Sequence, residues 1–342
     1  MMLFRRAKET DFDDIHHLAK ESGVGITTLP KNPDLLQKRI ALSTLSFKKK
    51  ISTPRDEYYL FVLECLEHKK VVGTSAILSA TGYDVPFYSY LISKHTRICH
   101  SERIRHDYDM LNLVNDYQGY SELCTLYLDP SFRVHGHGLL LSRARFLFIA
   151  QFPMRFAANM IAEMRGVADE KGQSPFWEQV GKHFFHMSFA KADGLTMSTN
   201  KQFITDLMPP NPIYVNLLSP STQAIIGKPH PLTNAAMTIL LQEGFAYKNY
   251  VDIFDAGPTI EASCKEIKTI TQSKLLRVKT TMDDVTNQRY LLANTKLDFR
   301  ATVSHMIQND KEDSCLLSHE TAELLEVKVG EWIRVSPLGS SQ

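Results

Sequence analysis

The sequence predicts a mixed α/β (α+β) protein with a small β-rich unit at its C-terminal end. Strand-like and helix-like patterns of apolar residues alternate between residues 2 and about 262. Two β-rich runs flank a polar turn at residues 67–70, which is the pattern of a hairpin. After Gly257 short strand-like runs follow one another, separated by polar turns. The 342 residues, 43% of them hydrophobic, are enough for two domains, and we expect these at residues 1–265 and 266–342.

The first elements follow from local patterns. Residues 2–7 resemble a short strand, and residues 9–23 have apolar side chains at helical spacing, with Thr10 as the expected N-cap. Gly23 and Gly25 are expected to end this helix. A second helix is predicted from Asn32, a favourable N-cap that is followed by proline at the first helical position.

The middle of the chain is predicted to be mostly extended. Residues 57–80 form the hairpin, and residues 86–94 are expected to continue the same meander. Residues 98–119 are polar and weakly patterned, so we expect an irregular connection with at most a short strand. Residues 120–129 alternate strongly enough for a strand, which Pro130 ends.

The second half alternates again between helices and strands. Helices are expected at residues 139–152, at 174–185 with Ser174 as N-cap, at 200–208, and at 231–245. Strands are expected at residues 159–166 and 246–255. From about residue 266 the strand-like runs are LLRVKTT, RYLLANT, FRATVSHMI and EWIRVSPL.

Residues 133–138 (RVHGHG), between a strand and an amphipathic helix, are the most informative short segment. Gly136 and Gly138 allow a ligand to approach the main chain closely, and the following helix offers unpaired N–H groups and a positive dipole end. Arg133 adds a positive charge, so the chemistry matches a pyrophosphate. The segment lacks the third glycine of the dinucleotide fingerprint and the lysine of the P-loop. His135 and His137 have no acidic or cysteine partner at useful spacing, so we expect no metal here.

Composition excludes several classes of function. The net charge of +1 provides no field that would attract nucleic acid or an anionic membrane. No apolar run is long enough to span a bilayer, and the first residues lack the apolar core of a signal peptide. The five cysteines are scattered without a CxxC spacing, which argues against disulfides and structural zinc. These features predict a reduced, cytoplasmic protein.

The order of elements and the R-x-x-G-x-G loop resemble the coenzyme A loop of the GCN5-related N-acetyltransferase superfamily. Longer blocks are more specific. SELCTLYLDP, SRARFLFIAQFP, AEMRGVADEKGQSPFWE, NKQFITDLMP and YVDIFDAGPTIEA are similar to the arginine N-succinyltransferase family, up to about residue 262 and more weakly to the end. The resemblance implies an acyl-CoA N-acyltransferase fold with a mixed, mostly antiparallel sheet. The chain departs from the family at Ala256, usually glycine, at His137, usually a small polar residue, and at Pro229, usually valine.

This resemblance implies a reaction and a set of residues. The succinyl group of succinyl-CoA, the co-substrate, would pass to the α-amino group of L-arginine as the first step of arginine degradation, without a metal. By resemblance Leu126 marks the acyl-CoA contact, through a backbone N–H that polarises the thioester, and His230 matches the family's proton donor. The remaining residues expected to bind the coenzyme are Arg133, Gly136, His137 and Gly138.

The sequence leaves several alternatives open. Glu122, Glu163 and Asp255 are candidates to bind the guanidinium group, and Arg165 to hold a carboxylate of arginine or of the succinyl group. The acceptor could instead be ornithine or another basic amine, and the donor acetyl-CoA. A non-catalytic, CoA-binding subunit is a further alternative. We expect a homodimer or a pair with a related subunit.

Overall fold

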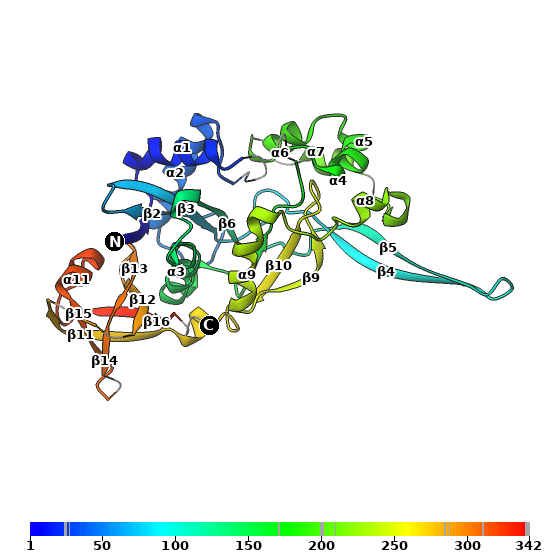
Figure 1. Cartoon of the computed structure of the whole chain (residues 1–342). Coiled ribbons are helices and arrows are strands. Elements are labelled where there is room, and N and C mark those ends of the chain that lie inside the picture. The colour runs from blue at the N-terminus through cyan, green and yellow to red at the C-terminus, as the bar shows by residue number, and fades with distance from the viewer. Residues whose placement is uncertain are drawn as a thin grey trace.

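The structure is a computed structural model of the whole chain (Figure 1). It describes residues 1–338 except 24, 25, 27, 170, 171, 199–201, 209, 284, 287 and 310. Gly25, expected to help end the first helix, lies outside the described residues.

The N-terminal elements agree with the sequence patterns. They are β1 (Met2–Arg6), α1 (Phe12–Glu21), α2 (Pro33–Lys48), β2 (Tyr58–Cys65) and β3 (Lys70–Leu78). The Asn32 side chain accepts the backbone N–H of Leu35 and caps α2 as predicted. Thr10 was predicted wrongly as a cap. It lies inside a 3₁₀ turn, and the carboxylate of Asp11 accepts the N–H of Lys8 instead.

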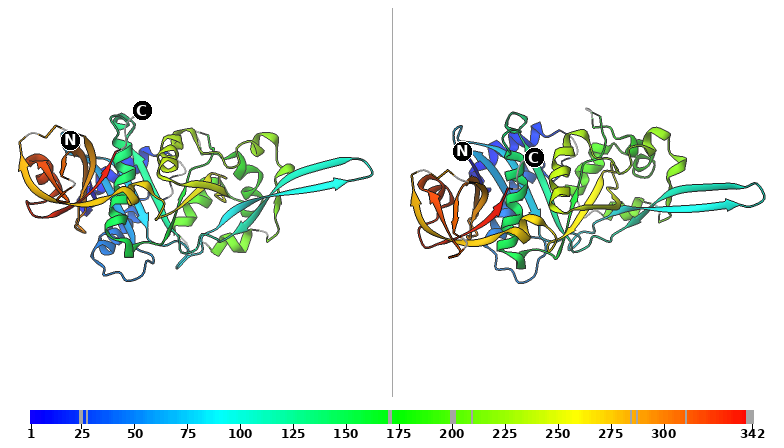
Figure 2. Two further views of the ribbon diagram at one scale, coloured as in Figure 1. Left: turned by 90° about the horizontal axis from the view of Figure 1, so that it is seen from below. Right: turned by 60° about the horizontal axis from the view of Figure 1, so that its bottom comes forward.

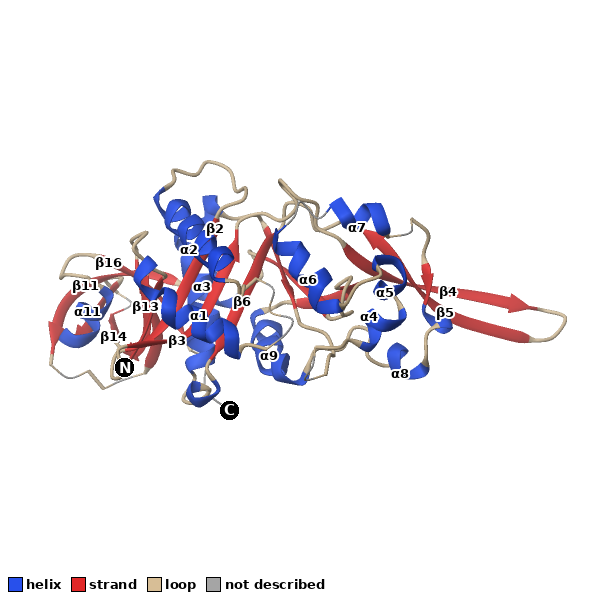
Figure 3. Ribbon diagram, turned by 90° about the horizontal axis from the view of Figure 1, so that it is seen from above, coloured by secondary structure: helices blue, strands red, loops and turns tan. Residues whose placement is uncertain are grey.

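The next two strands correct the sequence prediction. β4 (Ser89–Cys99) pairs with β5 (Ile104–Val114) in an eleven-residue register, where an irregular connection was expected. β4 also pairs with β9 (Ala246–Val251), so it does not continue the β2–β3 meander. Most of this ribbon projects from the body as a two-stranded arm with neither face covered (Figures 1 and 3). Its side chains are therefore mostly polar, and the sequence pattern resembled that of a loop.

The elements that surround the loop at 133–138 follow the prediction. They are β6 (Ser121–Leu128), α3 (His137–Gln151) and β7 (Asn159–Glu163). The predicted helix at 174–185 is broken at Val180 into α4 (Pro175–Gln179) and α5 (Gly181–Phe185), although Ser174 caps it as expected. The following elements are α6 (Phe189–Ser198), α7 (Gln202–Leu207), β8 (Ile213–Tyr214), α8 (Pro220–Gln223), α9 (Asn234–Glu243) and β10 (Pro258–Ser263).

The C-terminal segment is rich in strands, as expected, but carries two short helices, α10 and α11, that the sequence reading missed. Its elements are α10 (Lys268–Gln272), β11 (Lys274–Met282), β12 (Arg289–Asn294), β13 (Arg300–His305), β14 (Ile307–Asn309), β15 (Ser314–Ser318), α11 (His319–Leu325) and β16 (Trp332–Pro337). β13 pairs with β1, which joins these strands to the rest of the sheet.

Within the described residues the strands form one sheet in the order β14-β15-β11-β16-β12-β13-β1-β2-β3-β6-β7-β10-β9-β4-β5-β8. The β6–β7 and β11–β15 pairs are parallel and the other pairs are antiparallel, so the predicted mixed, mostly antiparallel sheet is confirmed. In Figure 1 helices α1 and α2 lie on one side of β2 and β3, and α3 lies on the other. Figure 2 shows α3 between the C-terminal strands and the body of the sheet. The helix contacts β12, β13 and β16 on one side and β1, β3 and β6 on the other.

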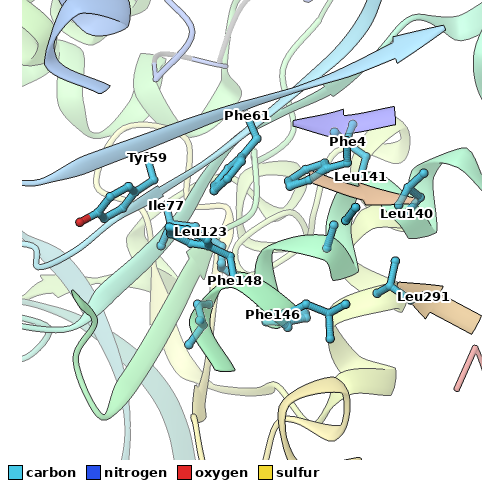
Figure 4. Close-up of a cluster of buried hydrophobic side chains, with 14 of the residues drawn as sticks. Phe4, Tyr59, Phe61, Ile77, Leu123, Leu140, Leu141, Phe146, Phe148 and Leu291 are labelled. Atoms are coloured by element: carbon cyan, nitrogen blue, oxygen red, sulfur yellow. The ribbon is translucent and has the colours of Figure 1, made fainter. Parts of the chain in front are cut away.

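The two faces of β2 supply two cores, because successive side chains of a strand point to opposite faces. Tyr59 and Phe61 pack with α3 residues such as Phe148, whose ring centroid lies 5.1 Å from that of Phe61 (Figure 4). Tyr58 and Leu60 pack under α1 and α2. Both cores meet β6, so the strand that carries the candidate site is fixed from both sides.

Candidate active site

The candidate site lies where two neighbouring parallel strands part. β6 and β7 are paired only at Ser121↔Met160 and Glu122↔Ile161. Both strands continue past this point, and residues 123–126 and 162–165 line an open cavity. Its volume is about 910 Å³ when the solvent-filled space at its mouth is included. An opening between parallel strands gives a ligand access to main-chain groups that a continuous ladder would occupy.

A β-bulge in β6 projects into this cavity. Thr74 pairs with Tyr127 and Ala76 with Cys124, so β6 has one residue more than β3 between the two pairs. Thr125 has a φ of +58°, which is unusual for a β-branched residue.

Hydrogen bonds to neighbouring elements hold this strained backbone. Thr125 donates its N–H to Oγ1 of Thr28 (3.0 Å), its Oγ1 lies 2.6 Å from the hydroxyl of Tyr58, and its carbonyl accepts Oγ1 of Thr74 (3.0 Å). Strain that is fixed in this way is typical of functional sites. The next residue, Leu126, is half-buried and lines the cavity.

Arg133 folds back over the end of β6. Its Nε donates to the carbonyl of Leu128 (3.0 Å), and its guanidinium carbon lies 5.7 Å from the ring centroid of Tyr127. The side chain is exposed, so its charge stays in contact with solvent beside the loop.

The glycines of the loop begin α3. Gly136 is the N-cap residue with φ +80°, and the preceding His135 has φ +52°. Gly138 lies in the first helical turn, where N–H groups have no partner within the helix. A Cβ atom at Gly138 would meet Leu128 only at 3.9 Å, so the space beside it is open.

His137 is partly buried in the same turn. Its Nδ1 lies 3.1 Å from the carbonyl oxygen of Phe132, and burial lowers its pKa below the usual value. Gly136 and His137 line a broad groove, which is shared with the end of α9 and with α10, rather than the cavity at Leu126. Thus the loop and Leu126 border two different hollows. In the chain, the last residues of β6 lie between Leu126 and the loop.

His230 does not itself line the cavity, but its backbone is bonded to two residues that do. Its N–H donates to the carbonyl of Arg165 (2.7 Å), and its carbonyl accepts the N–H of Thr233 (2.8 Å). Its Nδ1 accepts the N–H of Leu232 (3.2 Å). Burial, and then the charge of Arg165, lower the pKa of His230, while a hydrogen bond to the Ala168 backbone acts in the opposite direction. The imidazole is therefore held in its neutral form near pH 7.

The four residues left open as substrate ligands all line the cavity: Glu122, Glu163, Asp255 and Arg165. The carboxylate of Asp255 accepts the N–H of Gly166 (2.7 Å) and of Gly257 (2.8 Å), so it fixes the turn beside β7.

The turn at Asp255 keeps a conformation that favours glycine. Ala256, where the family usually has glycine, adopts φ +56° and is fully buried.

The acidic side of the cavity extends into a second hollow. Glu122, Glu163 and Asp252 line both this adjoining hollow, which Arg39 also borders, and the cavity at the bulge. With Asp255 these make four carboxylates, which provide the charge that a guanidinium or another basic group requires.

Sequence reasoning missed Arg145. This α3 residue is 1% exposed and lines the cavity beside the bulge. The signal was present, because an arginine inside the apolar run LLLSRARFLFIA occupies a helix face that is otherwise buried.

The described part of the chain offers neither a metal cluster nor a membrane-spanning helix. No three His, Cys, Asp or Glu side chains come together as a possible metal site. No helix in the same part of the chain is long and apolar enough to cross a membrane. The five cysteines are all free.

Comparison with known proteins extends these observations. A family model described as arginine N-succinyltransferase beta subunit matches residues 2–269, and a model of the C-terminal domain of that subunit matches residues 274–337. The arginine N-succinyltransferase of Yersinia enterocolitica is 41% identical over 99% of this chain and 98% of its own length. The arginine N-succinyltransferase subunit beta of Pseudomonas aeruginosa is 41% identical over 100% of this chain and 99% of its own length.

The solved structure of arginine/ornithine succinyltransferase subunit AI from Pseudomonas aeruginosa superposes with a TM-score of 0.89, at 35% identity and 99% coverage of both chains. This match confirms the predicted acyltransferase fold. Since the family model spans most of the chain and relatives share 41% identity over nearly its full length, this chain is an acyltransferase that belongs to the arginine N-succinyltransferase family.

Proposed function

We propose that this chain transfers the succinyl group of succinyl-CoA to the α-amino group of L-arginine, giving N2-succinyl-L-arginine and CoA. The observation that supports this most directly is the cavity at the parting of β6 and β7, which joins a strained bulge to an acidic hollow. The amine attacks the thioester carbonyl, a C–N bond forms and the C–S bond breaks. On becoming an amide N–H the ammonium group loses two protons: one goes to the leaving thiolate and the other is released to solvent.

Leu126 polarises the thioester through its backbone. The bulge interrupts the regular β3–β6 ladder at this residue, which makes its N–H available to an oxygen in the cavity. A positioned donor of this kind stabilises the developing oxyanion by about 3 kcal/mol. Because the role belongs to the main chain, the leucine side chain can pack independently of the chemistry.

His230 moves the proton. A neutral imidazole can accept a proton from the incoming ammonium group and return it to the thiolate. The lowered pKa of His230 keeps it in the accepting form at neutral pH. Its backbone bond to Arg165 fixes its place beside the cavity.

The loop holds the pyrophosphate of the coenzyme. Gly136 and Gly138 present the N-terminal turn of α3, and Arg133 adds charge at the end of β6. His137, neutral through its lowered pKa, contributes a polar contact rather than a charge.

Valine at position 138 is expected to weaken CoA binding by at least tenfold with little effect on the melting temperature. The added side chain enters open space on the ligand side of the first helical turn, so it displaces the pyrophosphate without a clash inside the protein. Isothermal titration of CoA measures the affinity. Gly194→Val is the control, since this helical glycine also has open space around it and no positive φ, and it lies far along the chain from the loop. Unchanged CoA affinity in folded Gly138→Val would remove the loop from the site.

Release of free CoA tests the whole proposal. Arginine and ornithine are each supplied with succinyl-CoA and with acetyl-CoA. Rapid release only with arginine and succinyl-CoA supports the proposal. Faster turnover of ornithine or of acetyl-CoA would favour the alternative acyltransferases, and tight CoA binding without turnover would favour a non-catalytic subunit.

Three broader features belong to the same proposal. We place the boundary between the two domains at residues 265/266. We also expect the protein to be in the cytoplasm, where its free cysteines stay reduced. Assembly as a homodimer or with a related subunit is supported by the β4–β5 arm, whose tip exposes Ile98 and Ile104 by 56% and 57%.

A further inference from the structure

Arg145 is a buried cation without an acidic partner. Its Nε donates to the carbonyl of Ser142 (3.0 Å) and its Nη2 to the hydroxyl of Ser142 (3.1 Å), both within its own helix. No carboxylate of the described residues forms an ion pair with it. A guanidinium has five N–H donors, and a single serine cannot satisfy them.

The other buried arginines of this chain are satisfied by the fold. Arg5 is paired with Asp11 and Glu64. Arg155 donates to the carbonyls of Ser46 and Lys49 and to the hydroxyl of Tyr59. Arg145 differs from both, and burial lowers its pKa to about 10. Keeping such a charge in place without a partner is unfavourable, which indicates that its partner is a ligand.

The position of Arg145 indicates which ligand group this is. It lines the cavity together with Thr125 and Leu126, so it borders the space beside the bulge where the thioester is proposed to lie. The same cavity is lined by apolar Ala236 and Leu240 from α9. An acyl chain of two methylene groups that ends in a carboxylate matches an apolar wall beside a cation.

Arg145 belongs to only one of the two cavities. Glu122, Glu163 and Asp252 line both, whereas Arg145 lines only the one at the bulge, as does Asp255. Within this cavity a carboxylate is repelled by the acidic side chains and attracted to Arg145. Arg165, also in this cavity, already interacts with other parts of the chain.

We propose that Arg145 binds the distal carboxylate of the succinyl group and thereby selects succinyl-CoA over acyl donors of equal length that lack the carboxylate. This inference rests on the proposed function, since it assigns the acyl end of the same site.

The test compares succinyl-CoA with butyryl-CoA, which has four acyl carbons and a methyl group in place of the carboxylate. We expect Arg145→Met to lower kcat/KM for succinyl-CoA by roughly 10²–10³-fold, because the buried carboxylate loses its partner. Turnover of butyryl-CoA is expected to stay the same or to rise. The variant should melt no earlier than the wild type, since an unpaired buried charge has been removed.

Arg155→Met is the matched control. It removes a buried arginine that lies outside the cavity, so it should lower the melting temperature and leave the preference for succinyl-CoA unchanged. Arg145→Lys, which keeps the charge but not the fork of donors, should retain part of the preference.

Titration of both thioesters without any amine separates the two proposals. Wild type should bind succinyl-CoA at least tenfold more tightly than butyryl-CoA, and Arg145→Met should bind the two alike. If the wild type shows this difference but transfers nothing to arginine, the proposed function fails and the role of Arg145 stands. If wild type and Arg145→Met discriminate equally, in binding and in turnover, the inference about Arg145 is overturned.

Discussion

Replacing His230 by alanine is expected to lower kcat by roughly 10²–10⁴-fold, the usual range for a positioned acid or base. The KM for succinyl-CoA should change little, because the coenzyme is held by the loop before α3 and by the bulge in β6. His230→Gln should not restore the rate, since glutamine can hydrogen-bond but does not titrate near pH 7. Stopped-flow measurement of CoA release, with melting curves to confirm folding, determines both constants.

His183→Ala is the control for this variant, because His183 is an exposed histidine on α5 whose loss should leave the rate unchanged. A rate near that of wild type in His230→Ala would exclude the histidine from catalysis. The proposed contacts of Leu126 and of the loop would then still hold, since neither depends on proton transfer.

The pH profile provides a second measure of the same residue. Burial lowers the pKa of His230, so the neutral imidazole persists to a pH below its usual titration range. As pH falls through this lowered pKa, the imidazole gains a proton and can no longer accept one. We therefore expect kcat/KM to be flat between about pH 7 and 8 and to fall on the acid side with an apparent pKa below about 6.5. The residual activity of His230→Ala should lack this acid limb.

Substitution of Gly257 by alanine is expected to destabilise the protein by about 3 kcal/mol, at the upper end of the range for overpacked interiors. A Cβ atom at this position would lie 2.0 Å from the carbonyl oxygen of Met164 and 2.5 Å from the backbone nitrogen of Gly166. Because both are main-chain atoms, β7 and β10 must move apart. The shift displaces Arg165, and with it the backbone contact of His230, so activity should fall together with stability. Urea denaturation monitored by tryptophan fluorescence measures the change.

Gly194→Ala is the control for this second variant. Gly194 is exposed on α6 with open space around it, and alanine is the better helix former, so the free energy of unfolding should rise slightly or stay the same. A midpoint for Gly257→Ala within error of the wild type would show that the β7–β10 junction can expand, contrary to this reasoning.

Much of the fold could be predicted because its signals are local. The Asn32 cap, the polar turn after β2, and the two glycines at the start of α3 each act through the few residues around them. The order of strand, loop and helix around residues 133–138 therefore followed from periodicity and turn chemistry alone. The arm of β4 and β5 was not predicted, because a strand without a buried face has no alternation of apolar residues in its sequence.

The sequence by itself determined the family, the alternation of strands and helices, and the identity of the loop, Leu126 and His230 as candidates. The tertiary structure alone decided that the pairing of β6 and β7 stops after Glu122, and that a bulge at Thr125 faces the opening. It also brought together four charged candidates from β6, from β7 and the segment after it, and from the turn before β10, and left Arg145 buried without an acidic partner. The physical reason is that these properties arise from contacts between segments distant in the chain. Periodicity shows that a side chain is buried, but only packing shows which groups are left for a ligand to satisfy.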